Sequence, residues 1–191
     1  MRWSPWQQAD AGPGDMSGHV FVDESKRRDY LLVAVVISPT ALDTTRKAIR
    51  ALVMPGQRRV HMKKEGSPRR SAIIETIIGA GVRATIYNAG HPGRHELTAR
   101  AACIRAVVAD AAAQGHHLLV LEQDDSLIQH DRRTLYAAVH AVGCQGELRY
   151  EHRRAEHELL LAIPDAIAWC WATGGHWRDR VHPIIENVRS V

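Results

Sequence analysis

The sequence predicts an α/β protein in which a mixed β-sheet is flanked by α-helices. Two short apolar runs lie close together near the start, "HVFVDES" (19–25) and "YLLVAVVIS" (30–38). After them, helix-like and strand-like segments alternate along the chain, an order typical of a sheet with helices packed on its faces. A composition of 45% hydrophobic and 24% charged residues is that of a globular protein with a substantial core.

The first two runs predict an antiparallel hairpin, because only the four residues "KRRD" separate them. The second run is rich in β-branched residues and has no polar alternation. It therefore predicts a central strand that is buried on both faces.

The rest of the chain predicts helices and strands in turn. Ser-Pro starts and Gly stops mark several helix boundaries, and Pro164 is expected to interrupt the last helix. The helices are predicted at 38–56, 67–81, 96–115, 132–143 and 155–175. The further strands are predicted at 58–64, 82–89, 116–125 and 147–154. Residues 176–191 are expected to form a basic tail that packs back on the body.

At 191 residues the chain is expected to form one domain, residues 19–191, after a flexible leader at 1–18. Met16 lies close to the predicted start of the fold. No apolar segment approaches the roughly 20 residues that cross a bilayer, and no signal peptide is apparent. Three scattered cysteines form no disulfide framework, which favours a cytoplasmic location and buried thiols.

The charge is mildly basic, with a net charge of +4 and a pI of about 9.2, which permits a polyanionic partner. Basic residues gather in three runs, 58–70, 130–134 and 151–154. Such runs are usually solvated faces, but around a shared centre they would suit a phosphate backbone. The candidate substrate-binding residues are His61, Lys63, Lys64, Arg132 and Arg153. On a strand, His61 and Lys63 would point to the same side.

Three acids stand at the edges of apolar elements. Asp23 ends the first strand, Glu122 ends the strand "HLLVLE", and Asp165 lies between "LLLAIP" and "AIAWCW". An ionised carboxylate in so apolar a stretch is costly unless it is paired, hydrogen-bonded or bound to metal. The alternatives for Asp165 are an exposed position or the cap of a half-helix that begins at Pro164.

Together the three acids suggest a metal centre. Carboxylates on strand ends and on a facing helix suit Mg²⁺ or Mn²⁺, which prefer oxygen ligands. Two such ions about 3.5–4 Å apart activate water and stabilise the leaving oxygen in phosphodiester cleavage.

The motifs "FVDES", "LVLEQDD" and "AIPDAIAW" resemble those of the DUF3800 family, whose members have an RNase H-like fold. The segment "VHMKK" is similar to that family's third strand, and the resemblance covers about residues 19–173. It implies a metal-dependent nuclease in which Asp23, Glu122 and Asp165 bind divalent metal. The sequence departs from the family pattern at Lys26, where Gly is frequent, and at Pro164, where Ala usually precedes the Asp.

Two further acids are candidates for a fourth metal ligand. Glu158 lies seven residues before Asp165, so both would share one face of an unbroken helix. Glu24 directly follows Asp23 and would point to the opposite face of a continuing strand, which makes it the weaker candidate.

Other functions remain open. The same fold also suits a nucleic-acid-binding or protein-interaction module without catalysis. The Trp-rich ends, Trp3 and Trp6 with Trp169, Trp171 and Trp177, suggest a homodimer contact, or side chains that cover the sheet. Structural zinc is disfavoured, since "HPGRH" has no matching Cys or His pair.

Overall fold

The structure is a computed structural model that describes residues 17–91, 93 and 95–191. Residues 1–16, which include Trp3, Trp6 and Met16, lie outside the described residues. The last two residues of the predicted leader, Ser17 and Gly18, are buried, and the Gly18 N–H donates to His116 Nδ1 at 3.1 Å.

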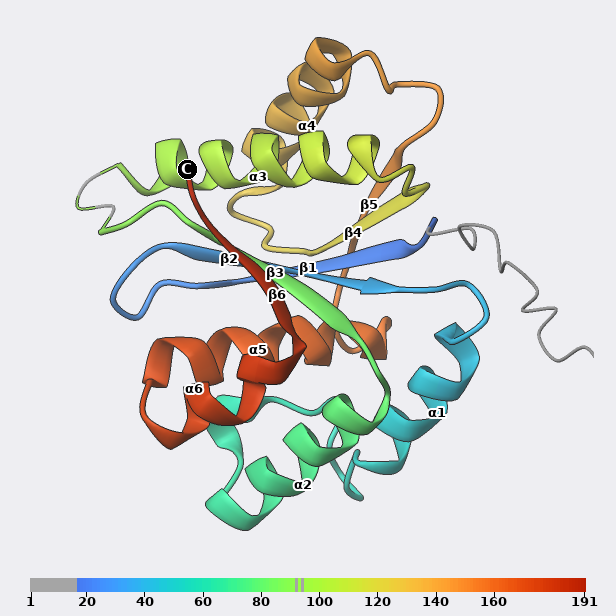
Figure 1. The fold of residues 1–191 in the computed structure, drawn as a ribbon, viewed down its shortest axis with the longest axis vertical. Helices are drawn as coiled ribbons and strands as arrows, with labels where there is room; N and C mark the ends of the chain where they lie inside the picture. The colour runs from blue at the N-terminus through green and yellow to red at the C-terminus, as the bar shows by residue number, and fades with distance from the viewer. Residues whose placement is uncertain (1–16, 92, 94) are drawn as a thin grey trace, which may run out of the picture.

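The predicted architecture, a mixed sheet flanked by helices, is confirmed (Figure 1). The described part of the chain holds one six-stranded sheet in the order β5-β4-β1-β2-β3-β6. Its strands are β1 (His19–Ser25), β2 (Leu31–Ile37), β3 (Arg83–Asn88), β4 (Leu118–Glu122), β5 (Arg149–Arg153) and β6 (Ile185–Ser190). In it, β2 runs antiparallel to both of its neighbours, and the other pairs are parallel.

The predicted hairpin of β1 and β2 is confirmed. The two strands pair antiparallel from His19 opposite Ile37 to Ser25 opposite Leu31. All but one of the residues of β2 are buried, as its unbroken apolar run predicts for a central strand.

Helices cover both faces of the sheet, so the molecule has three layers (Figure 1). On one face lie α3 and α4, and on the other lie α1, α2, α5 and α6. The helices are α1 (Leu42–Ala51), α2 (Ser67–Gly79), α3 (Glu96–Ala113), α4 (Ile128–Val142), α5 (Ala162–Thr173) and α6 (His176–Val181). None of the helices in the described part is long and apolar enough to cross a membrane.

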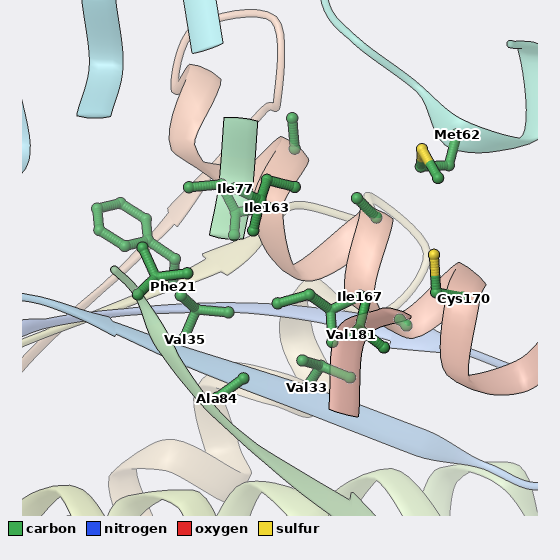
Figure 2. Close-up of a cluster of buried hydrophobic side chains, with 14 of the residues drawn as sticks. Phe21, Val33, Val35, Met62, Ile77, Ala84, Ile163, Ile167, Cys170 and Val181 are labelled. Atoms are coloured by element: carbon green, nitrogen blue, oxygen red, sulfur yellow. The ribbon is translucent and has the colours of Figure 1, made fainter. Parts of the chain in front are cut away.

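The alternation of side chains along the strands divides the core in two. Phe21, Val33 and Val35 point toward α5, where they meet Ile163 and Ile167 (Figure 2). Residues of the opposite register, such as Val22 and Leu32, pack against α3 and α4. The three cysteines are free and buried, as expected.

Several expectations about the elements were wrong. Residues 58–64 form an irregular segment that ends in a 3-10 turn (Met62–Lys64), so His61 and Lys63 do not share the face of a strand. The last long helix begins at Ala162, after another 3-10 turn (Leu159–Leu161), and not at 155. The expected basic tail does pack back on the body: it contains α6 and β6, and β6 pairs in parallel with β3.

Pro164 does not interrupt a helix, because it is the third residue of α5. The first turn is where proline is tolerated, since backbone N–H groups there have no acceptor within the helix. The α4 helix also begins four residues earlier than predicted, at Ile128.

Candidate functional site

The parallel pairing of β1 and β4 brings Asp23 and Glu122 to the same edge of the sheet. Val22 lies opposite Leu121, so the next residue of each strand is one of the two acids. Side chains two residues apart on a strand point to the same face, so Asp23 shares the face of Phe21 and Glu122 shares that of Val120. Both apolar residues belong to the core on the α5 side. The acids therefore leave the carboxyl ends of neighbouring strands on the face that α5 covers.

This edge is a topological switch point of the sheet. From β1 the chain continues to β2 on one side, and from β4 it continues to β5 on the other. Crevices at the carboxyl ends of strands at such points are the usual ligand sites of open α/β sheets.

Asp165 approaches from the first turn of α5. Its Oδ2 atom accepts a hydrogen bond from the Met62 N–H at 3.0 Å and lies 3.3 Å from His61 Nδ1. The carboxylate is half-buried, and Pro164 and Ala166 on either side of it are buried. Its place in a helical first turn is also favourable for a negative charge.

Asp23 interacts electrostatically with both of the other acids. Burial raises the pKa of Asp23 well above its ordinary value, and the negative charges of Glu122 and Asp165 raise it further, against a smaller lowering effect of Arg59. Its Oδ1 accepts the Glu24 N–H at 2.7 Å. The structure thus brings the three predicted acids into one electrostatic unit, in which ionisation of Asp23 is unfavourable.

The segment before α2 supplies the partners of these acids. Arg59 Nη1 lies 2.5 Å from Glu122 Oε1, and His61 and the Met62 N–H face Asp165. Among the residues that the structure describes, no group of three or more His, Cys, Asp or Glu side chains is placed to hold a metal ion. Asp23 and Glu122 interact through their side chains, Arg59 pairs with Glu122, and His61 and the Met62 N–H contact Asp165.

Glu158 does not join the three acids as predicted. It precedes α5, and its carboxylate accepts the Leu160 N–H at 3.1 Å and pairs with Arg46 of α1 at 3.2 Å. The prediction assumed a helix that continued from 155 through Asp165, and the structure has an irregular segment and a 3-10 turn there.

Glu24 points away from Asp165, as its place next to Asp23 on a strand predicts. It accepts the Tyr30 hydroxyl at 2.8 Å and pairs with Lys26 at 2.7 Å and with Arg100. These partners lie on the α3 side of the sheet, so Glu24 belongs to a different network.

Three adjoining hollows surround the acids. The Arg59 hollow, of about 620 Å³, is lined by Arg59, His61, Lys64, Glu122 and Arg154 among others. The Asp23 hollow, of about 570 Å³, lies beside Asp23, Glu24 and Glu122. The Trp169 groove, of about 670 Å³, is lined by residues that include Arg27, His61, Lys63, Arg70, Asp165 and Trp169.

The predicted substrate-binding residues divide into two groups. His61, Lys63 and Lys64 line the hollows beside the acids. Arg132 is exposed on α4, in the layer on the other face of the sheet, and lines none of the three hollows. Arg153 ends β5 and pairs with Glu151 at 2.6 Å, also outside the hollows.

Sequence reasoning missed several residues of the site. Arg59, Arg70 and Arg154 belong to the basic runs, but a run does not tell which of its members face a cleft. Arg100 was also missed, although a charged residue among the apolar positions of a helix was a usable signal. Arg100 is 3% exposed, and its guanidinium donates to both Asp131 oxygens at 2.6 Å.

Comparison of the chain with models of known protein families gave no match, and a search of curated proteins gave none either.

Proposed function

We propose that this protein is a metal-dependent nuclease of the DUF3800 family with an RNase H-like fold. Its acids Asp23, Glu122 and Asp165 would bind Mg²⁺ or Mn²⁺. The observation that carries the proposal is the meeting of these three acids, from β1, β4 and α5, at one edge of the sheet. The fold supports the same proposal, since a mixed sheet flanked by helices is the architecture that the resemblance implies.

The chemistry of the site suits a hard divalent cation. Its donors are carboxylate oxygens, which Mg²⁺ and Mn²⁺ prefer. Burial and the negative charges of Glu122 and Asp165 raise the pKa of Asp23, and a bound cation would favour its ionised form. When bound, such ions supply an activated water and stabilise the leaving oxygen of a phosphodiester.

The chain's own residues prepare the site for a polyanion. Lys63 and Lys64 are exposed beside the acids, where they attract and position a phosphate backbone. The His61 ring, held 3.3 Å from Asp165, lies where two of the hollows meet and faces any phosphate that reaches the acids.

The direct test is cleavage of labelled DNA and RNA oligonucleotides, single-stranded and duplex, with Mn²⁺ or Mg²⁺. We expect cleavage that EDTA stops. Asp165→Asn should lower the rate about 100-fold or more, since even residues that only orient metal ligands contribute 10–100-fold. The matched control is Asp179→Asn, an exposed acid on α6, which should cleave like the wild type.

Metal binding has an independent readout in thermal unfolding. Mn²⁺ should raise the melting temperature of the wild type and of Asp179→Asn, because a ligand that binds only the folded state stabilises it. It should raise that of Asp165→Asn much less. Cleavage that persists unchanged in Asp165→Asn would refute the proposed site.

A second function is favoured by the ion pair between Arg59 and Glu122 and by the bonds that already engage Asp165. A protein whose acids are permanently engaged in this way would be a nucleic-acid-binding module, or a protein-interaction module, without catalysis. Absence of cleavage with any metal, together with oligonucleotide binding that weakens as salt rises, would establish the nucleic-acid-binding form of this alternative.

A further inference from the structure

The Trp169 groove combines unpaired cations with an aromatic ring next to Asp165. Its residues come from four separate segments: Arg27 from the turn after β1, Lys63 from the 3-10 turn, Arg70 from α2 and Trp169 from α5. Trp169 lies one helical turn after Asp165, so the ring and the carboxylate share a face of α5. The groove therefore leads directly to the proposed metal site.

Three cations of this groove lack carboxylate partners, whereas a fourth, Lys26, pairs with Glu24 at 2.7 Å and with Glu96 at 2.6 Å. Among the described residues, no acid pairs with Arg27, Lys63 or Arg70; Arg27 donates to the Thr173 hydroxyl at 2.7 Å, and Arg70 to the Met62 carbonyl at 3.0 Å. The arginines of the Arg59 hollow differ, since Arg58 pairs with Glu156 at 3.2 Å and Arg154 with Asp125 at 2.6 Å. Three cations without an acidic partner thus line the Trp169 groove, next to the carboxylates of Glu24 and Asp165.

The Trp169 ring is held as a rigid platform. The Arg70 guanidinium carbon lies 4.3 Å from the centre of the ring, and Trp177 contacts it edge-on, with ring centres 5.5 Å apart. The side chain is half-buried and packs against the core, so it has little freedom to lose when a ligand binds. Stacked aromatic and guanidinium planes are surfaces on which unpaired bases stack.

We infer that the Trp169 groove binds the unpaired nucleotides of a single-stranded nucleic acid. Arg27 and Lys63 contact its phosphates, and the Arg70–Trp169 pair stacks on a base. This inference rests on the proposed function and deepens it by naming the substrate class. A duplex cannot make these contacts, because the faces of its bases are covered by the neighbouring bases of the stack. Only an unstacked base reaches the half-buried Trp169 ring.

Binding is measured by fluorescence anisotropy in EDTA, with a labelled 20-nucleotide single strand and with the same sequence as a duplex. We expect tighter binding of the single strand. Trp169→Leu keeps an apolar side chain but removes the ring, and should weaken single-strand binding about 10-fold, since stacking contributes 1–3 kcal/mol per base. Trp169→Phe should restore most of the affinity.

The matched control is Trp171→Leu, since Trp171 also lies on α5 but stacks with Arg178 and does not line the groove. It should bind both oligonucleotides within about twofold of the wild type. Lys63→Gln changes an exposed side chain, so it should fold normally. It should reduce the slope of log affinity against log salt by about 0.7, the value for one phosphate contact in a single strand.

Equal binding of duplex and single strand, or no effect of Trp169→Leu in a protein with an unchanged melting temperature, would overturn the inference. Competition by poly-glutamate would also overturn it if poly-glutamate displaces the single strand and binds Trp169→Leu more weakly than the wild type. That result would identify an acidic polypeptide as the ligand. Cleavage is scored separately. If the wild type does not cleave but Trp169→Leu weakens single-strand binding, only the proposed nuclease activity is refuted. If Trp169→Leu cleaves and binds like the wild type, only the proposed role of the groove is refuted.

Discussion

At the scale of single residues, the acids at and near the site differ in whether a positively charged side chain pairs with them. Glu122 has Arg59, Glu24 has Lys26 and Arg100, and Glu158 has Arg46. Asp23 has no cation within ion-pair distance among the described residues, and it is the acid whose pKa is raised well above normal. Such an arrangement costs stability, and sites that hold unfavourable charge are frequently functional.

Replacing Asp23 should therefore stabilise the protein at neutral pH. Below the pKa of the unfolded state, near 3.8, such an acid is protonated in both states and does not lower the free energy of unfolding. As the pH rises toward the higher pKa of the folded state, the acid ionises more easily in the unfolded state, so the free energy of unfolding falls. Asp23→Asn keeps the oxygen that accepts the Glu24 N–H and removes the charge. We expect its melting temperature at pH 7 to exceed that of the wild type by about 2 °C or more.

The same comparison at pH 3 is the control, because Asp23 is then protonated in both states and the two proteins should melt alike. A variant that melts below the wild type at pH 7 would contradict the electrostatic account. In oligonucleotide assays with Mn²⁺, Asp23→Asn should be inactive, so the gain in stability would come with a loss of activity.

At the scale of elements, the decisive segments are those without regular structure. The 58–64 segment was predicted to be a strand, and as an irregular segment it brings Arg59 and His61 to the acids. The segment before α5 was predicted to be helix, and as a 3-10 turn it separates Glu158 from Asp165. The residues of each segment have the pattern of the predicted strand or helix. The path of the backbone, however, is set by the elements on either side.

Glu158 should consequently matter for stability and not for cleavage. Glu158→Ala removes the cap of the 3-10 turn and the ion pair with Arg46, and should lower the free energy of unfolding by about 1 kcal/mol. Chemical denaturation measures this loss. Arg46→Gln, which removes the pair but keeps the cap, should cost less. A loss of Mn²⁺-dependent cleavage in Glu158→Ala would restore it as a metal ligand.

At the scale of the whole molecule, a buried charge network joins the sheet to the α3–α4 layer. Arg100 of α3 contacts Asp131 of α4, the Tyr30 hydroxyl and Glu24. His152 of β5 lies 3.4 Å from Asp131, without a hydrogen bond of good geometry. Burial by itself raises the pKa of Asp131, but the hydrogen bonds of Arg100 and the proximity of His152 outweigh it and lower the pKa to about 2.

This network should make the fold sensitive to acid. An acid with a lowered pKa contributes stability above its unfolded value, near 3.8, and the contribution is lost as the pH falls toward 2. We expect the wild type to lose about 2 kcal/mol of unfolding free energy from Asp131 in this range. Between pH 4 and 2, the unfolding free energy of the double variant Arg100→Met/Asp131→Leu should therefore fall by about 2 kcal/mol less than that of the wild type. Denaturant unfolding measures both.

Arg100→Met alone leaves the buried Asp131 charge without its main partner and should cost about 3–5 kcal/mol at pH 7. The double variant should recover most of this loss, because it removes both charges together. Equal stabilities of the single and double variants would show that the pair does not act as a unit.

The sequence by itself determined the layered α/β architecture, the central hairpin and the acids at three element edges. These features follow from local signals: apolar runs set the strands, Gly and Pro set many boundaries, and the cost of burying a charge identifies Asp165. Only the tertiary structure decided which residues meet. The parallel pairing of β1 with β4 joins acids 99 residues apart, and α5 places Asp165 beside them. The irregular segments bring Arg59 to the acids and move Glu158 away, because the path of such segments depends on long-range packing that no local pattern records.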